Sequence, residues 1–391
     1  MIIVDKPFVS DFLKKTIEEN SFPVVKTENA VKLGFSKGSN ILSEEDAIQK
    51  AKSAENNLIY TTSENSIGWI DKHLSFTDLP HKIDIFKNKV KFRTLIKTMY
   101  PDFYFREIQL DELDKLSVES IPVPFIIKPA VGFFSMGVYK VTTPNEWQKV
   151  KIALTSELLN AKDLYPSEVL NTTSFIIEQC IEGEEFAIDA YFTASGEPVI
   201  LNIYKHVFSS SGDVSDRVYI SSKEIIESNI DQFSEFLVEV GKLAEVSNFP
   251  VHVEIRREHD GSILPIEINP MRFGGWCTTA DMTYLAYGFN PYVFYFTQTR
   301  PDWSEILKNK AGKLYSIVVL DNSTGIEGNQ ITSFDYDLLL SYFENPLELR
   351  KIDYKEYPVF GFLFTETKED NFSELERILK SDLNEFITVN R

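Results

Sequence analysis

Residues 251–269 read VHVEIRREHDGSILPIEIN, two alternating stretches on either side of Asp260-Gly261. An Asp-Gly pair between such stretches is one of the strongest short-range signals for a β-hairpin, because glycine accepts the positive φ that a type I′ turn requires. The sequence therefore predicts two antiparallel strands joined by a two-residue loop.

The register of this hairpin decides which side chains share a face. Counting outward from a two-residue loop sets Glu254 opposite Glu267. The same count sets His252 opposite Asn269, and directly opposed residues lie on one face of the pair. The other face receives the apolar side chains of Val253, Ile255, Ile266 and Ile268. We expect the apolar face to join a core and the polar face to carry two carboxylates.

Two facing carboxylates are unfavourable at a Cβ separation of about 5 Å unless one is protonated or a cation lies between them. Mg²⁺ prefers hard oxygen ligands and is usually completed by waters and substrate phosphates. Glu254, Glu267 and Asn269 are therefore the candidate ligands of a Mg²⁺ ion, or of Mn²⁺, in a nucleotide site. The pairing alone leaves a solvated acidic face as the alternative.

A loop with one cation and paired glycines follows the second strand. Residues 267–270 read EINP, and Arg272 and Gly274-Gly275 come directly after. This segment, together with the earlier acid Glu254, resembles the metal-binding signature of the ATP-grasp superfamily. The resemblance implies that Arg272 holds a substrate carboxylate or the oxygens of an acyl phosphate, and that the glycines let backbone amides approach it.

The resemblance also implies phosphate contacts earlier in the chain. Residues 125–130 form an apolar, β-branched run that contains Lys128, and a flexible loop follows. A lysine leaving a buried strand offers a point charge to phosphate oxygens. In the superfamily pattern Lys128 contacts phosphate, while Ser135 and Gly137 lie in the loop that covers the phosphates. Phe133-Phe134 stands where many relatives have small residues, which leaves the geometry of this loop open.

Residues 175–190 are predicted to run strand, connector, strand, and they resemble the hinge of the same superfamily. By that likeness the connector backbone lies against adenine, and Glu185 accepts the ribose hydroxyls. The adenine-lining residues that it implies are Glu178, Gln179, Cys180 and Ile181. Each of these positions alone could belong to an ordinary strand pair that is rich in glutamate.

Further lysines are candidates for the phosphates. Residues 88–96 are predicted to form an amphipathic helix whose first lysine, Lys89, matches the first nucleotide lysine of the family. Lys91 or Arg93 on the same helix are alternatives. Lys205 is a weaker candidate for the γ-phosphate.

The composition agrees with a folded enzyme of several domains. The 391 residues include 43% apolar and 13% aromatic residues, which excludes disorder for most of the chain. The net charge of -19 argues against nucleic acid or anionic membrane as partners. No apolar run approaches membrane length, and Cys180 and Cys277 are too few for a disulfide framework, so a cytoplasmic location is expected. Cys277 is expected to be a small buried residue and not a nucleophile, because no base is evident beside it.

The coarse order of elements predicts a mixture of α/β and α+β units with the ATP-grasp fold. Residues 1–85 are expected to form a small α/β domain with a parallel sheet. Residues 86–175 and 176–300 are expected to be the two lobes that hold the nucleotide, and residues 301–391 a separate small α+β unit. The resemblance covers positions 86–300.

The resemblance implies an ATP- and Mg²⁺-dependent ligase. A small-molecule carboxylate would be activated as an acyl phosphate and attacked by an amine or another nucleophile, and the enzyme could be a homodimer. Two alternatives remain open: a carboxylase or carbamoyl-phosphate-synthase-like subunit that uses bicarbonate, and a non-catalytic nucleotide-binding module. Specificity is expected in the terminal regions and in residues 209–219, and no pattern there identifies the acid or the nucleophile.

Overall fold

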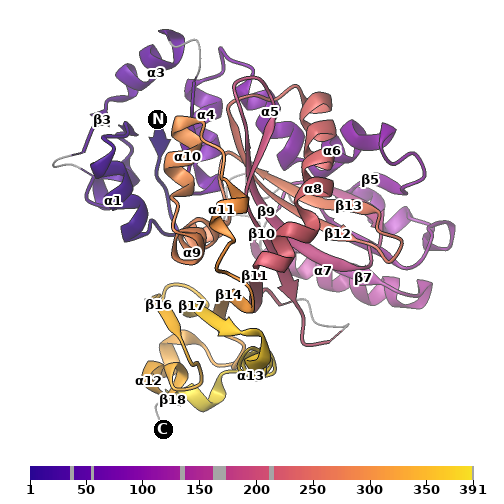
Figure 1. The fold of residues 1–391 in the computed structure, drawn as a ribbon. Coiled ribbons are helices and arrows are strands. Elements are labelled where there is room, and N and C mark those ends of the chain that lie inside the picture. Colours follow the sequence, from indigo (N-terminus) through magenta and orange to yellow (C-terminus); the bar gives the residue numbers. More distant parts are fainter. Residues whose placement is uncertain (36–38, 54–56, 133–136, 162–172, 211–214, 390–391) are drawn as a thin grey trace.

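The computed structural model describes residues 1–35, 39–53, 57–132, 137–161, 173–210 and 215–389. These residues form a parallel sheet near the N-terminus and antiparallel sheets in the rest of the chain (Figure 1). The predicted mixture of α/β and α+β units is confirmed. The predicted domain borders stay predictions.

The N-terminal sheet has the strand order β3-β2-β1-β4, and all its pairs are parallel. Its strands are β1 (Ile2–Ile3), β2 (Val24–Val25), β3 (Ile41–Leu42) and β4 (Tyr60–Thr61). The helices between them are α1 (Asp11–Glu19), α2 (Glu28–Lys32) and α3 (Glu44–Ser53). The predicted parallel sheet is thus confirmed. Helix α1 begins where Ser10 accepts a hydrogen bond from the amide of Leu13, which satisfies one of the free amides of the first turn.

Three helices and a second sheet follow. The helices are α4 (Ile67–His73), α5 (Leu79–Lys87) and α6 (Lys89–Leu95). The sheet has the order β5-β8-β6-β7 and contains β5 (Phe105–Gln109), β6 (Phe125–Pro129), β7 (Tyr139–Val141) and β8 (Ser174–Gln179). Helix α7 (Trp147–Ala161) comes between β7 and β8. This sheet and α7 enclose a separate hydrophobic core, in which Phe125 of β6 and Trp147 of α7 are buried.

The largest sheet has eight strands in the order β13-β12-β9-β10-β11-β14-β17-β16. Its strands before residue 301 are β9 (Glu184–Phe192), β10 (Pro198–Val207), β11 (Val218–Ser221), β12 (Phe249–Arg257) and β13 (Ile263–Pro270). The long helix α8 (Lys223–Ala244) packs against β10. Helices α9 (Thr278–Tyr287), α10 (Pro291–Thr297) and α11 (Trp303–Ile306) follow, and α9 and α10 lie between the central sheet and the N-terminal strands (Figure 1).

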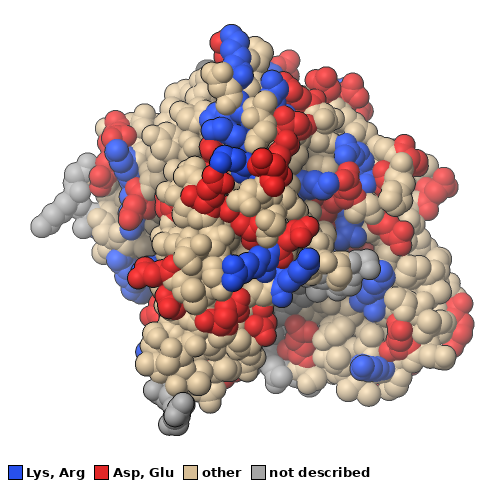
Figure 2. All heavy atoms as spheres, turned by 60° about the horizontal axis from the view of Figure 1, so that its bottom comes forward, with Lys and Arg blue, Asp and Glu red and all other residues tan. Residues whose placement is uncertain are grey.

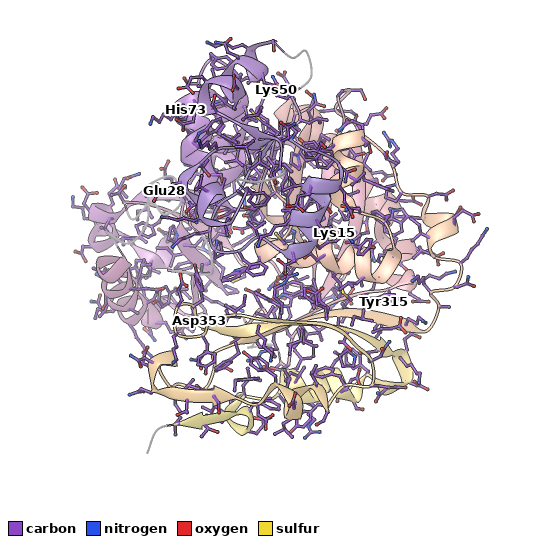
Figure 3. The ribbon with its side chains drawn as sticks, turned by 90° about the vertical axis from the view of Figure 1, so that its left-hand side faces the viewer. Lys15, Glu28, Lys50, His73, Tyr315 and Asp353 are labelled. Carbon is purple, nitrogen blue, oxygen red and sulfur yellow. The ribbon has the colours of Figure 1, made fainter. Side chains whose placement is uncertain are left out.

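The C-terminal strands extend this sheet, so the segment after residue 301 is joined to the preceding part by strand pairing. β14 (Lys313–Asp321) pairs with β11, β17 (Val359–Lys368) pairs with β14, and β16 (Pro346–Lys351) forms the edge. The edge groups of β11 require partners, and β14 supplies them. The other C-terminal elements are α12 (Tyr336–Leu340), α13 (Ser373–Leu379) and the pair β15 (Ile331–Phe334) and β18 (Ile387–Val389). In the side view of Figure 3 the part that carries Tyr315 and Asp353 lies below the N-terminal part with Lys15 and His73.

The hairpin of β12 and β13 has the predicted pairing but not the predicted loop. The amide of Glu258 donates to the carbonyl of Ser262 at 2.9 Å, and Gly261 has φ +86° as the third residue of a three-residue loop. This loop shifts the register by one residue, so that Ile255 faces Pro265. A bulge at Ile266 then restores the predicted pairs. A turn followed by glycine in the left-handed region is the usual three-residue solution.

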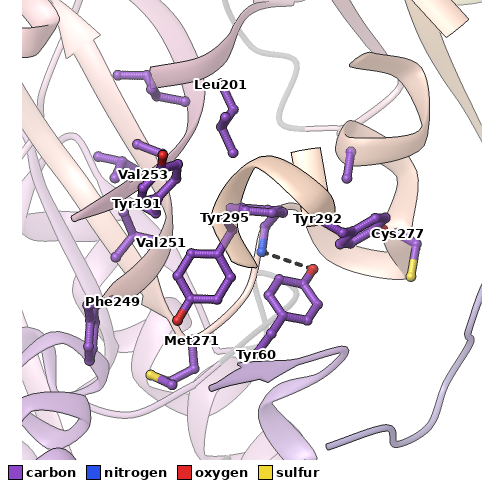
Figure 4. Packing of buried hydrophobic residues seen from close by; sticks show 14 of the residues in the cluster. Tyr60, Tyr191, Leu201, Phe249, Val251, Val253, Met271, Cys277, Tyr292 and Tyr295 are labelled. Carbon is purple, nitrogen blue, oxygen red and sulfur yellow. Dashed lines mark hydrogen bonds between the residues drawn. The ribbon is translucent and has the colours of Figure 1, made fainter. Parts of the chain in front are cut away.

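Aromatic packing joins the N-terminal domain to the end of this hairpin (Figure 4). The ring of Tyr60 lies 5.2 Å from that of Phe273, and its hydroxyl accepts a hydrogen bond from the Phe273 amide at 3.3 Å. The amide of Thr61 donates to the carbonyl of Met271 at 2.8 Å. The hydroxyl of Tyr295 donates to Ile59 and Asn248 carbonyls on both sides of this junction. The loop after β13 is therefore held by the end of β4.

Acidic and basic side chains are interspersed over the face shown in Figure 2. The net charge of -19 arises from 59 Asp and Glu residues against 40 Lys and Arg residues. No helix within the described ranges is both long and apolar enough to cross a membrane.

Candidate active site

Glu254 and Glu267 are direct partners across β12 and β13, as predicted. His252 faces Asn269, also as predicted. The side-chain amide of Asn269 donates to Oε1 of Glu267 at 3.2 Å and approaches Oε1 of Glu254 at 3.5 Å. The three predicted metal ligands therefore lie together on one face of the sheet.

The two carboxylates of this pair have opposite electrostatic surroundings. Burial, together with the negative charges of Glu267, Glu185 and Asp216, holds the pKa of Glu254 well above its ordinary value. Burial also disfavours the ionised form of Glu267, but the charge and hydrogen bond of Lys89, together with the charges of Lys128 and Lys87, outweigh it and lower the pKa of Glu267 well below its ordinary value. A divalent cation between the two acids would stabilise the ionised form of both.

This donor set fits Mg²⁺ by its chemistry. It has two carboxylates and one amide, and a side-chain amide can rotate to present its oxygen to a metal. No group of three or more His, Cys, Asp or Glu side chains that could hold a metal ion occurs in the described ranges. A metal at this position would therefore depend on Glu254, Glu267 and Asn269, with its remaining positions completed by water and phosphate.

Helix α6 places Lys89 against the hairpin. Asn88 caps the helix by accepting hydrogen bonds from the amides of Val90 and Lys91. Lys89, the first residue of the helix, is buried, and its Nζ lies 2.8 Å from Oε2 of Glu267. Lys91 lies on the exposed side, where it pairs with Asp84. Of the two lysines on this helix, Lys89 is the one that reaches the acids.

A second buried ion cluster lies beside the first. Oε1 of Glu178 is 2.6 Å from Nζ of Lys128, and Oε2 is 2.6 Å from Nε of Arg93. Burial opposes the ionisation of Glu178, but the charges of Arg93 and Lys128 outweigh it and hold its pKa at about 2. Arg93 also donates to the carbonyl of Pro265 at 2.6 Å, which joins α6 to β13. The side chain of Glu178 thus orients cations, while its backbone lies near the hinge.

The predicted adenine-lining residues follow one another at the end of β8 and in the connector to β9. The amide of Gln179 donates to the carbonyl of Tyr104 at 3.0 Å, and the amide of Tyr104 donates to Oε1 of the Gln179 side chain at 2.9 Å. The carbonyl of Ile181 accepts a hydrogen bond from Arg256 at 2.6 Å. Their role in binding adenine stays a prediction.

Glu185 is more constrained than the sequence indicated. Its Oε1 lies 2.9 Å from Nδ1 of His206, and its Oε2 accepts two hydrogen bonds from Arg256. Arg256 faces Glu185 across β9 and β12. A ribose hydroxyl would bind to a carboxylate that Arg256 and His206 already orient.

Arg272 forms a buried cluster with two residues that the sequence reasoning missed. Its NH2 group lies 2.9 Å from Oε1 of Glu64, and its NH1 group donates to the carbonyl of Phe273 at 2.9 Å. Lys87 binds Oε2 of Glu64 and donates to the carbonyl of Gly132 at 3.3 Å. Glu64 lies in a stretch without a recognisable motif, so no sequence signal identified it. Lys87 ends α5 close to Lys89, and that proximity was an available signal.

Asp189 was also missed, and it links the hairpin to the loop that carries Arg272. Its Oδ1 lies 2.7 Å from Nδ1 of His252 and accepts a hydrogen bond from the amide of Gly274 at 3.0 Å. The other oxygen of Asp189 is buried without a hydrogen-bond partner among the described residues. His252 approaches Glu254 with Nε2 at 3.8 Å from Oε1. The carboxylate of Asp189 therefore orients both His252, which lies beside Glu254, and the backbone amide of Gly274.

Not every candidate joins the site. Lys205 faces Phe186, which in turn faces Ile255, so Lys205 lies on the opposite face of the sheet from Glu254. It pairs there with Glu184 at 2.5 Å, which argues against a γ-phosphate contact. The alternation of strand residues makes the adjacent His206, and not Lys205, the residue on the acidic face.

The phosphate-covering loop is described only in part. Ser135 and Phe133-Phe134 lie outside the described residues. Gly137 has φ +69°, and its amide donates to Oε1 of Glu157 at 3.0 Å. Cys277 is buried, and burial raises the pKa of its thiol, in agreement with a structural role.

Comparisons with known proteins agree with this architecture. Residues 121–280 match the family of ATP-grasp domains. The chain therefore contains an ATP-grasp domain, and the resemblance of its motifs to this superfamily is confirmed. A comparison with curated protein sequences finds no significant match.

Solved structures with the ATP-grasp fold align along nearly the whole chain. L-amino acid ligase from Bacillus licheniformis aligns with TM-score 0.69 at 18% identity, over 100% of this chain and 98% of that chain. Biotin carboxylase from Campylobacter jejuni aligns with TM-score 0.63 at 12% identity, over 100% and 91%. N5-carboxyaminoimidazole ribonucleotide synthetase from Thermotoga maritima aligns with TM-score 0.62 at 14% identity, over 99% and 98%. At such identities these alignments establish the fold.

Proposed function

We propose that this protein is an ATP- and Mg²⁺-dependent ligase that activates a small-molecule carboxylate as an acyl phosphate and joins it to an amine. One observation carries the proposal: the facing acids Glu254 and Glu267 lie beside Lys89, and the buried pair of Arg272 and Glu64 follows the same hairpin. Two acids and a lysine suit a metal-bound triphosphate, and the arginine suits a carboxylate.

The reaction consists of two displacements. An oxygen of the substrate carboxylate attacks the γ-phosphorus of ATP, the bond from that phosphorus to the β–γ bridging oxygen breaks, and ADP leaves. The amine nitrogen then attacks the acyl carbon, the bond from that carbon to the phosphate oxygen breaks, and the amine loses a proton as inorganic phosphate leaves. Such a reaction requires alignment and charge stabilisation more than a protein nucleophile.

The residues of this chain would divide that work. Mg²⁺ would supply positive charge at the phosphates when it is bound by Glu254, Glu267 and Asn269. Lys89 and Lys128 would hold phosphate oxygens as fixed charges, because their own partners Glu267 and Glu178 keep them in place. Arg272 would orient the carboxylate, and the amides beside Gly274 and Gly275 would approach the acyl phosphate.

Support for a C–N ligase also comes from the L-amino acid ligase, whose fold aligns along the whole chain. The folds of biotin carboxylase and N5-carboxyaminoimidazole ribonucleotide synthetase also align. Bicarbonate is therefore included among the acids to be tested.

The test measures phosphate release from ATP and Mg²⁺ with amino acids, other small carboxylic acids and bicarbonate, each with and without an amine. We expect turnover that requires one organic acid and rises with the amine, and its loss in Glu267→Gln. Glu239→Gln, at an exposed position of α8, is the matched control and should retain turnover. Near-normal turnover in Glu267→Gln would exclude the metal role of this acid. Turnover with bicarbonate alone would favour a carboxylase, and no turnover with any acid would favour a nucleotide-binding module.

A further inference from the structure

Arg350 is a buried arginine of the edge strand β16 that reaches the loop behind Arg272. Its NH1 group donates to the carbonyl of Trp276 at 2.7 Å, and its NH2 group lies 2.6 Å from Oδ2 of Asp281. Only 6% of its side chain is exposed. Asp281 belongs to α9, so one guanidinium binds a loop carbonyl and the helix that follows this loop.

The loop carbonyl that Arg350 binds belongs to an unusual piece of backbone. Trp276 has φ 58° and ψ 21°, and Cys277 has φ 60° and ψ 16°. Two successive non-glycine residues in the left-handed region are unfavourable, and such a conformation persists only where its surroundings hold it. These residues directly follow Gly274-Gly275 and connect them to α9.

Three parts of the fold meet around this arginine. Its guanidinium lies 4.9 Å from the ring centre of Phe8 in the N-terminal domain and 4.9 Å from that of Phe364 in β17. The Trp276 ring packs against the rings of Tyr357 and Phe362 from the C-terminal segment. The C-terminal extension of the sheet therefore encloses the end of the loop formed by residues 272–277.

The carboxylate of Asp281, which Arg350 binds, is held in place from a second side. The hydroxyl of Tyr292 donates to Oδ1 of Asp281 at 3.2 Å. At the edge of the cluster, Oε1 of Glu348 lies 3.3 Å from the NH2 group of Arg350. Burial raises the pKa of Asp281 to about 7, against the opposing charge of Arg350. The bidentate geometry of a guanidinium, with one group on a carbonyl and one on a carboxylate, cannot be reproduced by the point charge of a lysine.

We propose that Arg350 is a positioning residue: by holding the Trp276 carbonyl against Asp281, it sets the conformation of residues 272–277 and hence the affinity of the enzyme for its carboxylate substrate. The kinetic part of this inference rests on the proposed function. The structural part concerns the loop alone. The edge strand β16 would thus serve the active site although the hydrogen bonds of Arg350 go to Trp276, Asp281 and Glu348 and not to Glu254, Glu267 or Asn269.

The test compares Arg350→Lys with Lys351→Arg, a matched control on the exposed side of the same strand. Amide hydrogen exchange is measured for residues 272–277 and for the core strand β10. We expect exchange of the loop amides to become at least about tenfold faster in Arg350→Lys, because a hydrogen bond from a charged group to the loop is lost. Exchange in β10 should not change. Unchanged loop exchange, or equal acceleration in β10, would overturn the proposal.

The kinetic arm uses the acid identified for the wild type. Arg350→Lys should raise the KM for the acid about tenfold, while the KM for ATP stays within about twofold. Equal changes of both would contradict a role in positioning the acid. If Arg350→Lys does not fold, Asp281→Asn removes the carboxylate that anchors the Arg350 guanidinium and should show the same selectivity for the loop and the acid. Faster loop exchange in a protein without turnover would confirm the positioning role and refute the proposed function.

Discussion

Nζ of Lys89 lies 2.8 Å from Oε2 of Glu267, which joins the start of α6 to one acid of the hairpin. This contact supplies the positive charge that keeps Glu267 ionised when its neighbour Glu254 is disfavoured as an anion. A lysine in this position can also reach a phosphate that approaches the same acids. In the proposed function, this pair would prepare the site for a triphosphate before the nucleotide binds.

Replacing Lys89 with Met should weaken binding of Mg²⁺-ATP by tenfold or more, because a buried charged contact is worth about 1.5–3 kcal/mol. Calorimetric titration with a non-hydrolysable ATP analogue measures the effect. Lys91→Met is the control, since Lys91 pairs with Asp84 on the exposed side of the same helix. Equal losses of affinity for Mg²⁺-ATP in both variants would show that the effect comes from the net charge of the protein and not from the position of Lys89.

Glu254→Gln should stabilise the metal-free protein and abolish its response to Mg²⁺. The pKa of Glu254 is raised in the folded state, so between its unfolded value and this raised value the folded protein binds more protons than the unfolded one. The free energy of unfolding therefore falls as pH rises above about 4.5. Gln removes this effect, so the variant should gain stability relative to wild type as pH rises.

Thermal unfolding from pH 4 to 8, with and without MgCl₂, checks this expectation. Added Mg²⁺ should raise the Tm of the wild type and leave that of Glu254→Gln unchanged. A Mg²⁺-induced shift of the same size in both proteins would place the metal elsewhere.

Glu178→Gln should destabilise the protein by about 3–5 kcal/mol at neutral pH, because it leaves Arg93 and Lys128 buried without their anion. The folded pKa of Glu178 is lowered to about 2, so its contribution is present above about pH 4.5 and is lost as pH falls towards 2. Chemical denaturation of both proteins at several pH values measures the difference. A difference that does not change between pH 5 and 2.5 would contradict this assignment.

Arg272→Ala should raise the KM for the acid much more than the KM for ATP, by at least tenfold in relative terms, because Arg272 pairs with Glu64 and not with Glu267 or Glu178, the partners of Lys89 and Lys128. Steady-state kinetics with each substrate varied in turn gives both constants. Glu64→Gln should show the same preference more weakly, since Glu64 orients the arginine and would not itself bind the acid. Equal changes in both constants for Arg272→Ala would assign this residue to the nucleotide.

The sequence alone determined the features that depend on local pattern. Strand alternation around Asp260-Gly261 placed Glu254 opposite Glu267, and a compensating bulge at Ile266 preserved that pairing although the loop has three residues. The order of motifs from Lys89 to Arg272 predicted the ATP-grasp fold.

Tertiary structure decided the features that depend on contacts between distant segments. Glu64 meets Arg272, Asp189 meets Gly274, and Arg350 meets Trp276 only after separate sheets and domains have packed together. The pairing of β14 with β11 belongs to the same class. Local alternation specifies the face on which a side chain lies, but its partner across the fold is set by how the elements pack, because buried charges and strand edges must find partners wherever the packed chain supplies them.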